Sequence, residues 1–240
     1  MPAALLVGVL SGCALRPQAA PALPQTPAPH EGTPYDIVPE ASLLTILVYR
    51  GGALASAGHN HVIASHELGG TIYVPAELLR SSFEIHVPVA TLTVDEAALR
   101  AQQSAADFPP DVSQGAQEGT RRNMLGPALL DAEHNPEIVL RAVRLERPAP
   151  AAGAAAVGAD GSDTVLAQLQ STVRGQVRTL TVPVRYQRGA GELTVSGELP
   201  LRQSDLGLTP FSAMLGALQV QDEMRVSFRI VARAAEPRSK

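Results

Sequence analysis

The histidines His59 and His61 are the residues whose type and spacing could most readily carry chemistry in this chain. On a β-strand, residues two positions apart point to the same face, so both imidazoles could ligate one metal ion. A zinc site needs three or four protein ligands, and the sequence shows no third ligand close by. His86 and His134 could complete such a site only if the fold brought them near.

The interpretation we favour is structural. It places His59 and His61 in a turn between two strands, at the mouth of the fold, with hydrogen bonds to the backbone. Ser56 and Ser65 belong to no recognised catalytic arrangement, and the chain contains no His-Glu-x-x-His, no Gly-x-Ser-x-Gly and no phosphate-binding loop. We therefore expect no catalytic residue, no bound metal and no cofactor. A metal-dependent or other enzyme that uses His59 and His61 remains the alternative.

The composition predicts one folded domain. The chain has 240 residues, of which 45% are hydrophobic and 18% charged, so apolar material for a core is ample. The net charge is −4 and the isoelectric point is about 5.9. Lysine and arginine are scattered singly along the chain, so nothing in the sequence resembles a nucleic-acid-binding surface.

Alternation of apolar and polar residues dominates the rest of the sequence. Apolar residues at every second position indicate a strand with one buried face. Between Ile138 and Leu145 the alternation changes phase, which predicts a β-bulge. The apolar faces of the other strands comprise Phe83, Ile85, Val87 and Val89; Val165, Ala167, Leu169 and Val173; Leu180, Val182, Val184 and Tyr186; Leu193, Val195, Leu199 and Leu201; and Met224, Val226, Phe228 and Ile230.

With further segments at Leu43 to Tyr49 and Val62 to Val74, the chain has about eight strand segments, separated by glycine, proline and polar turns. Long strands with one apolar face favour a closed barrel, which leaves no exposed edge. We therefore predict an all-β fold: an eight-stranded antiparallel barrel, lipocalin-like, with a helical excursion between about Asp95 and Leu125. The run that begins at Asp95 looks like a capped helix, and Pro109 and Pro110 interrupt it.

The first 13 residues look like a signal peptide with a lipobox. A short apolar run leads into Leu10-Ser11-Gly12-Cys13, and this run is too short to span a bilayer. We expect acylation of Cys13, the only cysteine, and hence a periplasmic lipoprotein held on a membrane by its acyl chains. Ala14 follows the cysteine, and by resemblance to bacterial sorting signals this favours the outer membrane.

Two stretches have compositions that cannot form a core. Residues 14–34 are rich in proline and alanine, so we interpret them as a tether, and the folded domain is expected over residues 35–235. The alanine- and glycine-rich stretch from Pro148 to Ser162 is interpreted as a long, mobile hairpin loop.

Several short motifs, taken in order, resemble the YceI-like, polyisoprenoid-binding family over Tyr35 to Ala232. The chain departs from the family pattern at Leu129-Leu130, at Thr179 and in its longer insert, and so resembles a divergent member. The motifs are Tyr35-Asp36-Ile37, Leu68-Gly69-Gly70-Thr71-Ile72, Asp131-Ala132-Glu133-His134-Asn135-Pro136-Glu137-Ile138, Val173-Arg174-Gly175 with Arg178, Ser204-Asp205-Leu206-Gly207-Leu208, and Val220 to Val226.

The resemblance implies binding rather than catalysis, with an isoprenoid or other long-chain lipid held inside the barrel. An eight-stranded barrel can hold one slim ligand or be filled by its own side chains, so a structural envelope protein with a filled core also remains open. His59 and His61, with Arg50 nearby, would then meet the polar end of the ligand at the mouth. The interior residues expected to bind the chain of the lipid are Phe83, Ile85, Val87, Val182, Val195, Val226 and Phe228.

Overall fold

The computed structural model describes residues 26–148 and 163–235. The predicted signal peptide and acylation site, the first part of the tether and nearly all of the insert lie outside these residues. Within these two ranges there are twelve strands, two α-helices and six short 3-10 helices. The strands are β1 Thr33–Ile37, β2 Leu43–Gly51, β3 His61–Ser65, β4 Gly69–Val74, β5 Ser82–Pro88, β6 Thr93–Val94, β7 Glu137–Glu146, β8 Asp163–Val173, β9 Gln176–Arg188, β10 Glu192–Arg202, β11 Ser212–Ala213 and β12 Leu218–Ala234.

The helical elements are short and lie mainly at the ends of strands. They are η1 Pro39–Ala41, η2 Ala55–Ala57, η3 Leu78–Arg80, η4 Val89–Thr91, α1 Ala97–Arg100, α2 Gln114–Leu125, η5 Ser204–Leu206 and η6 Met214–Gly216. No helix within the described ranges is long and apolar enough to cross a membrane.

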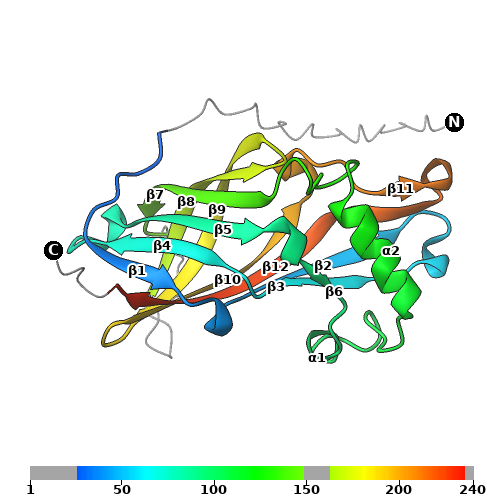
Figure 1. Ribbon diagram of the computed structural model, residues 1–240, viewed down its shortest axis with the longest axis horizontal. Coiled ribbons are helices and arrows are strands. Elements are labelled where there is room, and N and C mark those ends of the chain that lie inside the picture. Colours follow the sequence, from blue (N-terminus) through cyan, green and yellow to red (C-terminus); the bar gives the residue numbers. More distant parts are fainter. Residues whose placement is uncertain (1–25, 149–162, 236–240) are drawn as a thin grey trace, which may run out of the picture.

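Eight antiparallel strands form a closed ring in the order β1-β4-β5-β7-β8-β9-β10-β12, which confirms the predicted barrel (Figure 1). The ring closes where β1 pairs with the end of β12, from Tyr35 opposite Ala234 to Ile37 opposite Ala232. Nearer its start, β12 pairs along the same edge with β2, and β3 and β6 continue the sheet beyond the ring. The segment expected as one strand from Val62 to Val74 is therefore two strands, β3 outside the ring and β4 within it.

The strand faces agree with the alternation in the sequence. The burial of β8 alternates without interruption from Val165 to Val173. The pairing of β7 with β8 shifts register between Ala142 and Arg144, so the predicted bulge is confirmed. Gly197 of β10 lies opposite Phe228 of β12. A Cβ atom on Gly197 would come within 2.6 Å of the Phe228 ring, so the glycine makes room for that ring.

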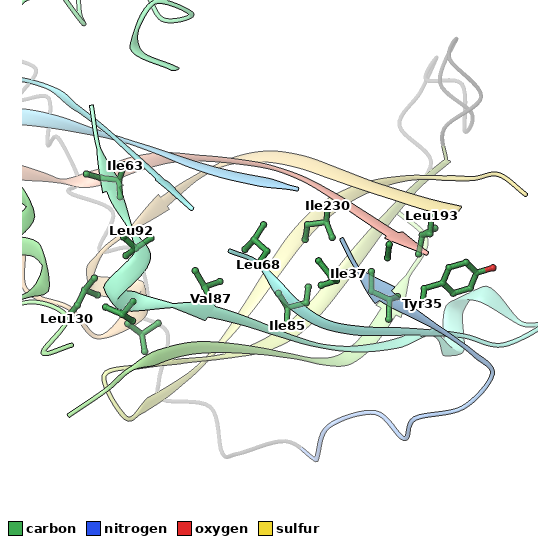
Figure 2. Packing of buried hydrophobic residues seen from close by; sticks show 14 of the residues in the cluster. Tyr35, Ile37, Ile63, Leu68, Ile85, Val87, Leu92, Leu130, Leu193 and Ile230 are labelled. Atoms are coloured by element: carbon green, nitrogen blue, oxygen red, sulfur yellow. The ribbon is translucent and has the colours of Figure 1, made fainter. Parts of the chain in front are cut away.

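The core runs along the inside of the barrel and consists mainly of aliphatic side chains (Figure 2). Tyr35, Ile37, Leu193 and Ile230 pack near the end where β1 closes the ring, and Ile63, Leu92 and Leu130 pack near the other end. A second, smaller cluster contains Val62, Ala64, Leu99 and Phe108, on the other face of β3. Since β3 is covered on both faces, all five of its residues are buried.

The excursion between β6 and β7 lies where it was predicted, but its helices differ from the expectation. The helix α1 is a single turn, and α2 begins at Gln114, where the Ser113 hydroxyl accepts a hydrogen bond from the Ala116 N–H at 3.3 Å. Asp95 caps no helix. Its backbone is left-handed, with φ of 55°, and its side chain is fully buried. The carboxylate therefore serves a tertiary contact instead of a cap.

Candidate functional site

The larger of two apolar cavities lies at the α2 end of the barrel and has a volume of about 400 Å³. The helix α2 contributes Ala116, Gly119, Thr120, Asn123 and Met124 to its wall. His59, His61 and Arg50 also line it, so both histidines, which the sequence predicted at the mouth of the barrel, lie at the wall of this cavity. The remaining wall is mostly aliphatic, with Gln203 and Gln219 as further polar residues.

The smaller cavity, of about 220 Å³, lies inside the ring and exposes only apolar atoms. All seven residues predicted to face the interior line it: Phe83, Ile85, Val87, Val182, Val195, Val226 and Phe228. The interior is therefore not filled completely by side chains, in contrast to the alternative of a filled core. That these residues bind a ligand remains a prediction.

The two cavities share part of their walls, so a single elongated molecule could occupy both. The shared wall is formed by residues from five strands, β2, β5, β7, β8 and β12, and from η5. The shared lining residues are Leu44, Ile46, Val87, Ile138, Val173, Leu206 and Met224.

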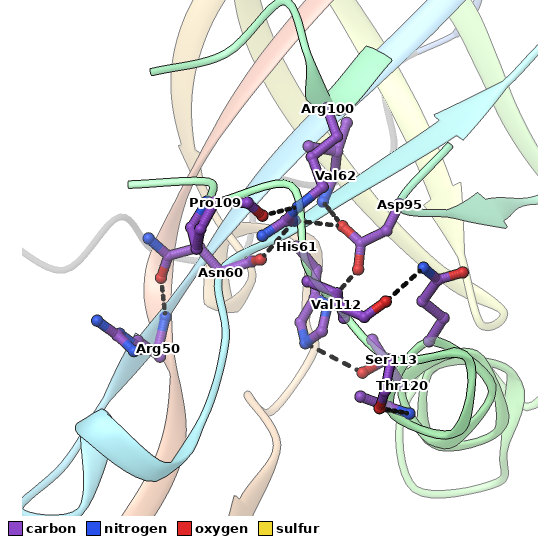
Figure 3. Close-up of polar contacts among 12 residues, drawn as sticks. Arg50, Asn60, His61, Val62, Asp95, Arg100, Pro109, Val112, Ser113 and Thr120 are labelled. Carbon is purple, nitrogen blue, oxygen red and sulfur yellow. Dashed lines mark hydrogen bonds and ion pairs between the residues drawn. The ribbon is translucent and has the colours of Figure 1, made fainter. Parts of the chain in front are cut away.

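His61 belongs to a chain of polar contacts at the wall of the larger cavity (Figure 3). Its Nδ1 lies 2.6 Å from Oδ2 of Asp95, and its Nε2 lies 3.1 Å from Oγ1 of Thr120 on α2. An ionised carboxylate can only accept, so Nδ1–H donates to Asp95. In the neutral imidazole, Nε2 is then the acceptor and the Thr120 hydroxyl donates to it. The prediction that the His61 ring bonds to the backbone is therefore wrong, because both ring nitrogens contact side chains.

Asp95 is held as a buried carboxylate by three donors. Its Oδ1 accepts hydrogen bonds from the Val62 N–H at 2.9 Å and from Nη1 of Arg100 at 2.7 Å. Burial acts to raise the pKa of Asp95, but the hydrogen bonds from His61 and Val62 and the nearby positive charge of Arg100 outweigh it. The net result is a lowered pKa for Asp95.

Arg100 balances the charge of Asp95 and ties the excursion to the barrel. Its side chain is 2% exposed, and it also donates to the backbone oxygens of Asn60 at 2.9 Å and Pro109 at 2.6 Å. Asn60 in turn accepts from the Arg50 N–H at 2.9 Å and donates to the Asp107 oxygen at 2.8 Å. The network thus holds both neighbours of His61 in the chain, because Asn60 accepts from Arg100 and Val62 donates to Asp95.

Three other histidines have carboxylate partners of their own, and His30 stacks on the ring of Tyr73. His66 contacts Glu96, His86 contacts Glu84 and Glu137, and His134 contacts Asp131. His59 is exposed, and its ring centre lies 6.0 Å from that of His61. Across residues 26–148 and 163–235, no three side chains of histidine, cysteine, aspartate or glutamate form a group able to hold a metal ion.

Sequence reasoning missed three members of this site. Asp95, Arg100 and Thr120 lie 34 to 59 residues from His61 along the chain, so no local spacing connects them. Asp95 was interpreted as the start of a helix, which is where aspartate is common. Its left-handed backbone and its burial are tertiary features that the sequence does not display.

Comparison with known proteins identifies the family and the fold. The model of the YceI-like domain matches residues 35–232. Among solved structures, BcnA of Burkholderia cenocepacia is 17% identical, with a TM-score of 0.55, over 82% of this chain and 99% of that one. A polyisoprenoid-binding domain from Saccharophagus degradans, implicated in plant cell wall breakdown, is 13% identical, with a TM-score of 0.52, over 84% of this chain and 98% of that one.

A search of curated proteins found no match. The family model covers most of the chain, and it spans the ring of eight strands together with the excursion that carries α2. The order of the motifs and the closed barrel agree with this match. The chain belongs to the YceI-like domain family.

Proposed function

We propose that the protein binds a long-chain lipid of the isoprenoid type in its barrel and carries out no chemistry on it. The observation that supports this most is the pair of apolar cavities with a shared wall. A ligand with a long apolar part could extend from one cavity into the other. The polyisoprenoid-binding domain of Saccharophagus degradans, which has the same fold, supports an isoprenoid as the ligand.

The lipid chain would lie in the smaller cavity, because that cavity offers only apolar atoms. Each buried methylene contributes about 0.8 kcal/mol before the cost of ordering the ligand. The polar end would lie in the larger cavity, where His59, His61 and Thr120 meet. The Thr120 hydroxyl donates a hydrogen bond to His61, and its oxygen can still accept a hydrogen bond from the ligand. Affinity would thus come from the apolar walls, and orientation from the polar groups.

We further propose that the chain is exported and anchored through an acylated Cys13. The lipobox-like Leu10-Ser11-Gly12-Cys13 supports acylation. The proline-rich stretch after it would separate the barrel from the membrane. This would make the protein a periplasmic lipoprotein, with the outer membrane as the favoured site.

Blocking the smaller cavity tests the binding proposal. Val195→Trp places a large ring inside the barrel, whereas Thr181→Trp places the same ring on an exposed position of β9 and serves as the matched control. Each purified variant is extracted with organic solvent, and the lipid is identified and quantified by mass spectrometry. Thermal melting checks folding, and the chain has no natural tryptophan, so the new indole reports its own environment by fluorescence.

We expect Val195→Trp to lose its lipid, Thr181→Trp to keep it, and His59→Ala to keep most of it. The proposal fails if Val195→Trp melts cooperatively and retains a full complement of lipid while His59→Ala loses it. That result would place the ligand outside the barrel interior.

A second candidate function is hydrolysis of a lipid ester, and the geometry around His61 favours it. Thr120, His61 and Asp95 form a hydroxyl-imidazole-carboxylate series like that of hydrolytic triads. Thr120 Oγ1 would attack the ester carbonyl carbon while His61 Nε2 takes the hydroxyl proton. The alcohol would leave with that proton, and water would then release the acyl group from Thr120.

Hydrolysis of a chromogenic long-chain ester distinguishes the two candidates. An enzyme would lose its activity on Thr120→Val and on His61→Ala, and Thr120→Ser would preserve it. If the protein retains lipid but shows no ester hydrolysis above that of Thr120→Val, the series only positions His61.

A further inference from the structure

The apolar tip, which we define as the turn of residues 51–58 and the loop of residues 209–217, projects from the α2 end of the barrel (Figure 1). The two segments are joined by the Leu54 N–H, which donates to the Ala217 oxygen at 2.7 Å. Of the four large hydrophobic side chains that are exposed in the described part of the chain, three lie here. Leu54 is 41% exposed, Met214 68% and Leu215 fully.

The tip carries no charged side chain. Residues 51–58 and 206–221 contain no aspartate, glutamate, lysine or arginine, although such residues make up 18% of the chain. Solubility alone would favour charges at a projecting loop. An uncharged tip with exposed leucine and methionine instead indicates a surface that is covered by an apolar partner.

The backbone of the tip turns these side chains outward at a cost. Met214 and Leu215 both have left-handed backbones, with φ of 51° and 56°. Residues with a Cβ atom rarely adopt this conformation, and when two neighbours do so the surrounding structure must impose it. Strain that exposes apolar side chains does not serve the core, so it favours a role for these side chains outside the barrel.

The base of the tip forms part of the larger cavity. Gly58, Phe211 and Leu218 line that cavity, and they flank the exposed residues in sequence. Leu215 is fully exposed and Met214 is 68% exposed, so a soft apolar phase can surround these side chains without a complementary pocket. A lipid bilayer offers such a phase, and an uncharged tip would enter it without requiring anionic lipids.

We propose that Leu54, Met214 and Leu215 insert into the surface of a lipid bilayer and hold the mouth of the larger cavity against the membrane. Contact of this surface with a bilayer does not depend on which ligand the cavity takes. It is also separate from anchoring by Cys13, because it places a particular end of the barrel at the membrane.

The test uses the full chain with Cys13→Ser, which removes both the expected acylation site and the only natural thiol. Leu215→Cys is labelled with a polarity-sensitive fluorophore and mixed with phosphatidylcholine vesicles. The matched control is Ala190→Cys, which is exposed in the turn between β9 and β10 at the opposite end of the barrel.

We expect a blue shift, and quenching by spin-labelled lipid, for the label at residue 215 and not for the label at residue 190. High salt and added anionic lipid should leave the shift unchanged. Leu54→Ser together with Met214→Ser should raise the vesicle concentration needed for half of the shift by about tenfold or more.

Three results would overturn the proposal. The first is no shift at residue 215, or an equal shift at both labelled positions. The second is a shift that appears without vesicles and grows with protein concentration, which would mean that the tip joins two copies of the chain. The third is a shift that requires anionic lipid, because the attraction would then be electrostatic and not apolar.

Discussion

Replacement of Asp95 should destabilise the protein more than the loss of any exposed ion pair would. In Asp95→Ala, Arg100 would lose the carboxylate that pairs with it in the described structure, while its side chain remains 2% exposed. Breaking a buried ion pair on one side costs about 3–5 kcal/mol. The left-handed backbone at this position adds about 1 kcal/mol or more for alanine, since aspartate tolerates that conformation better. This loss is a large part of the 5–15 kcal/mol that typically holds a domain folded.

Urea denaturation followed by circular dichroism measures the loss. Asp95→Asn is the milder variant, because its side-chain oxygen can still accept from Val62 and Arg100, and it should lose about 1–3 kcal/mol. Glu192→Ala is the control. It breaks the exposed pair with Arg233, whose atoms are 3.4 Å apart, and should cost less than about 1 kcal/mol.

The double variant Asp95→Asn with Arg100→Met tests the reasoning itself. If the cost arises from an unpaired buried charge, removal of both partners should cost less than the sum of the two single variants. Additive losses would refute this explanation, as would an Asp95→Ala variant that loses less than about 1 kcal/mol with an unchanged slope in urea.

Four further predictions concern pH, anchoring, metal and packing. Because the pKa of Asp95 is lowered in the fold, its contribution to stability is present above the unfolded pKa of about 4 and is lost progressively as the pH falls from that value through the lowered pKa of the folded protein. Over this pH range, the unfolding free energy of Asp95→Asn should therefore decrease less than that of the unsubstituted protein. Metabolic labelling with a palmitate analogue should disappear in Cys13→Ser, and labelling that survives would contradict the lipobox. Purified protein should contain no stoichiometric transition metal by elemental analysis; a metal that is lost on His61→Ala would favour the enzyme. Gly197→Ala should cost about 1–3 kcal/mol in thermal or urea unfolding, because its methyl group meets both the Phe228 ring and the backbone oxygen of Pro183, and an unchanged stability would show that the ring and the neighbouring strand both move aside freely.

The barrel could be predicted because a strand with one buried face has an apolar residue at every second position. The alternation identified the inward residues of β5, β9, β10 and β12, and the cavity lining agrees with it. The phase change in β7 likewise marked the bulge. The extension of the sheet by β2, β3 and β6 could not be read this way, because β3 is buried on both faces and its residues show no alternation.

The site could be predicted only in part. His59 and His61 drew attention by their type, but the carboxylate of Asp95, 34 residues from His61, has no local signature. Whether the barrel is hollow depends on how side chains of similar size pack across it. The same valines and leucines are consistent with a filled core or with two cavities, and only the arrangement of the strands distinguishes these outcomes.

The position of α2 has a consequence for how fast a ligand could leave. In the described part of the chain, β6 ends the extension of the sheet, and α2 lies beside it at the end of the barrel (Figure 1). Only Met124 of this helix is buried. Hydrogen bonds from Thr120 to His61 and from Arg121 to the Ala90 oxygen, at 2.6 Å, tie it down.

Displacing α2 would break these contacts, a second hydrogen bond from Arg121 to the Leu92 oxygen and the packing of Met124 and Leu125 on the core, but no hydrogen bond between ring strands. Such an opening costs only local free energy, so the amides of α2 would exchange with solvent far faster than those of β8 or β9. The residence time of a bound molecule would then depend on this local equilibrium and not on unfolding of the barrel. Substitutions at Arg121 could therefore change the release rate over a wide range while the melting temperature stays the same.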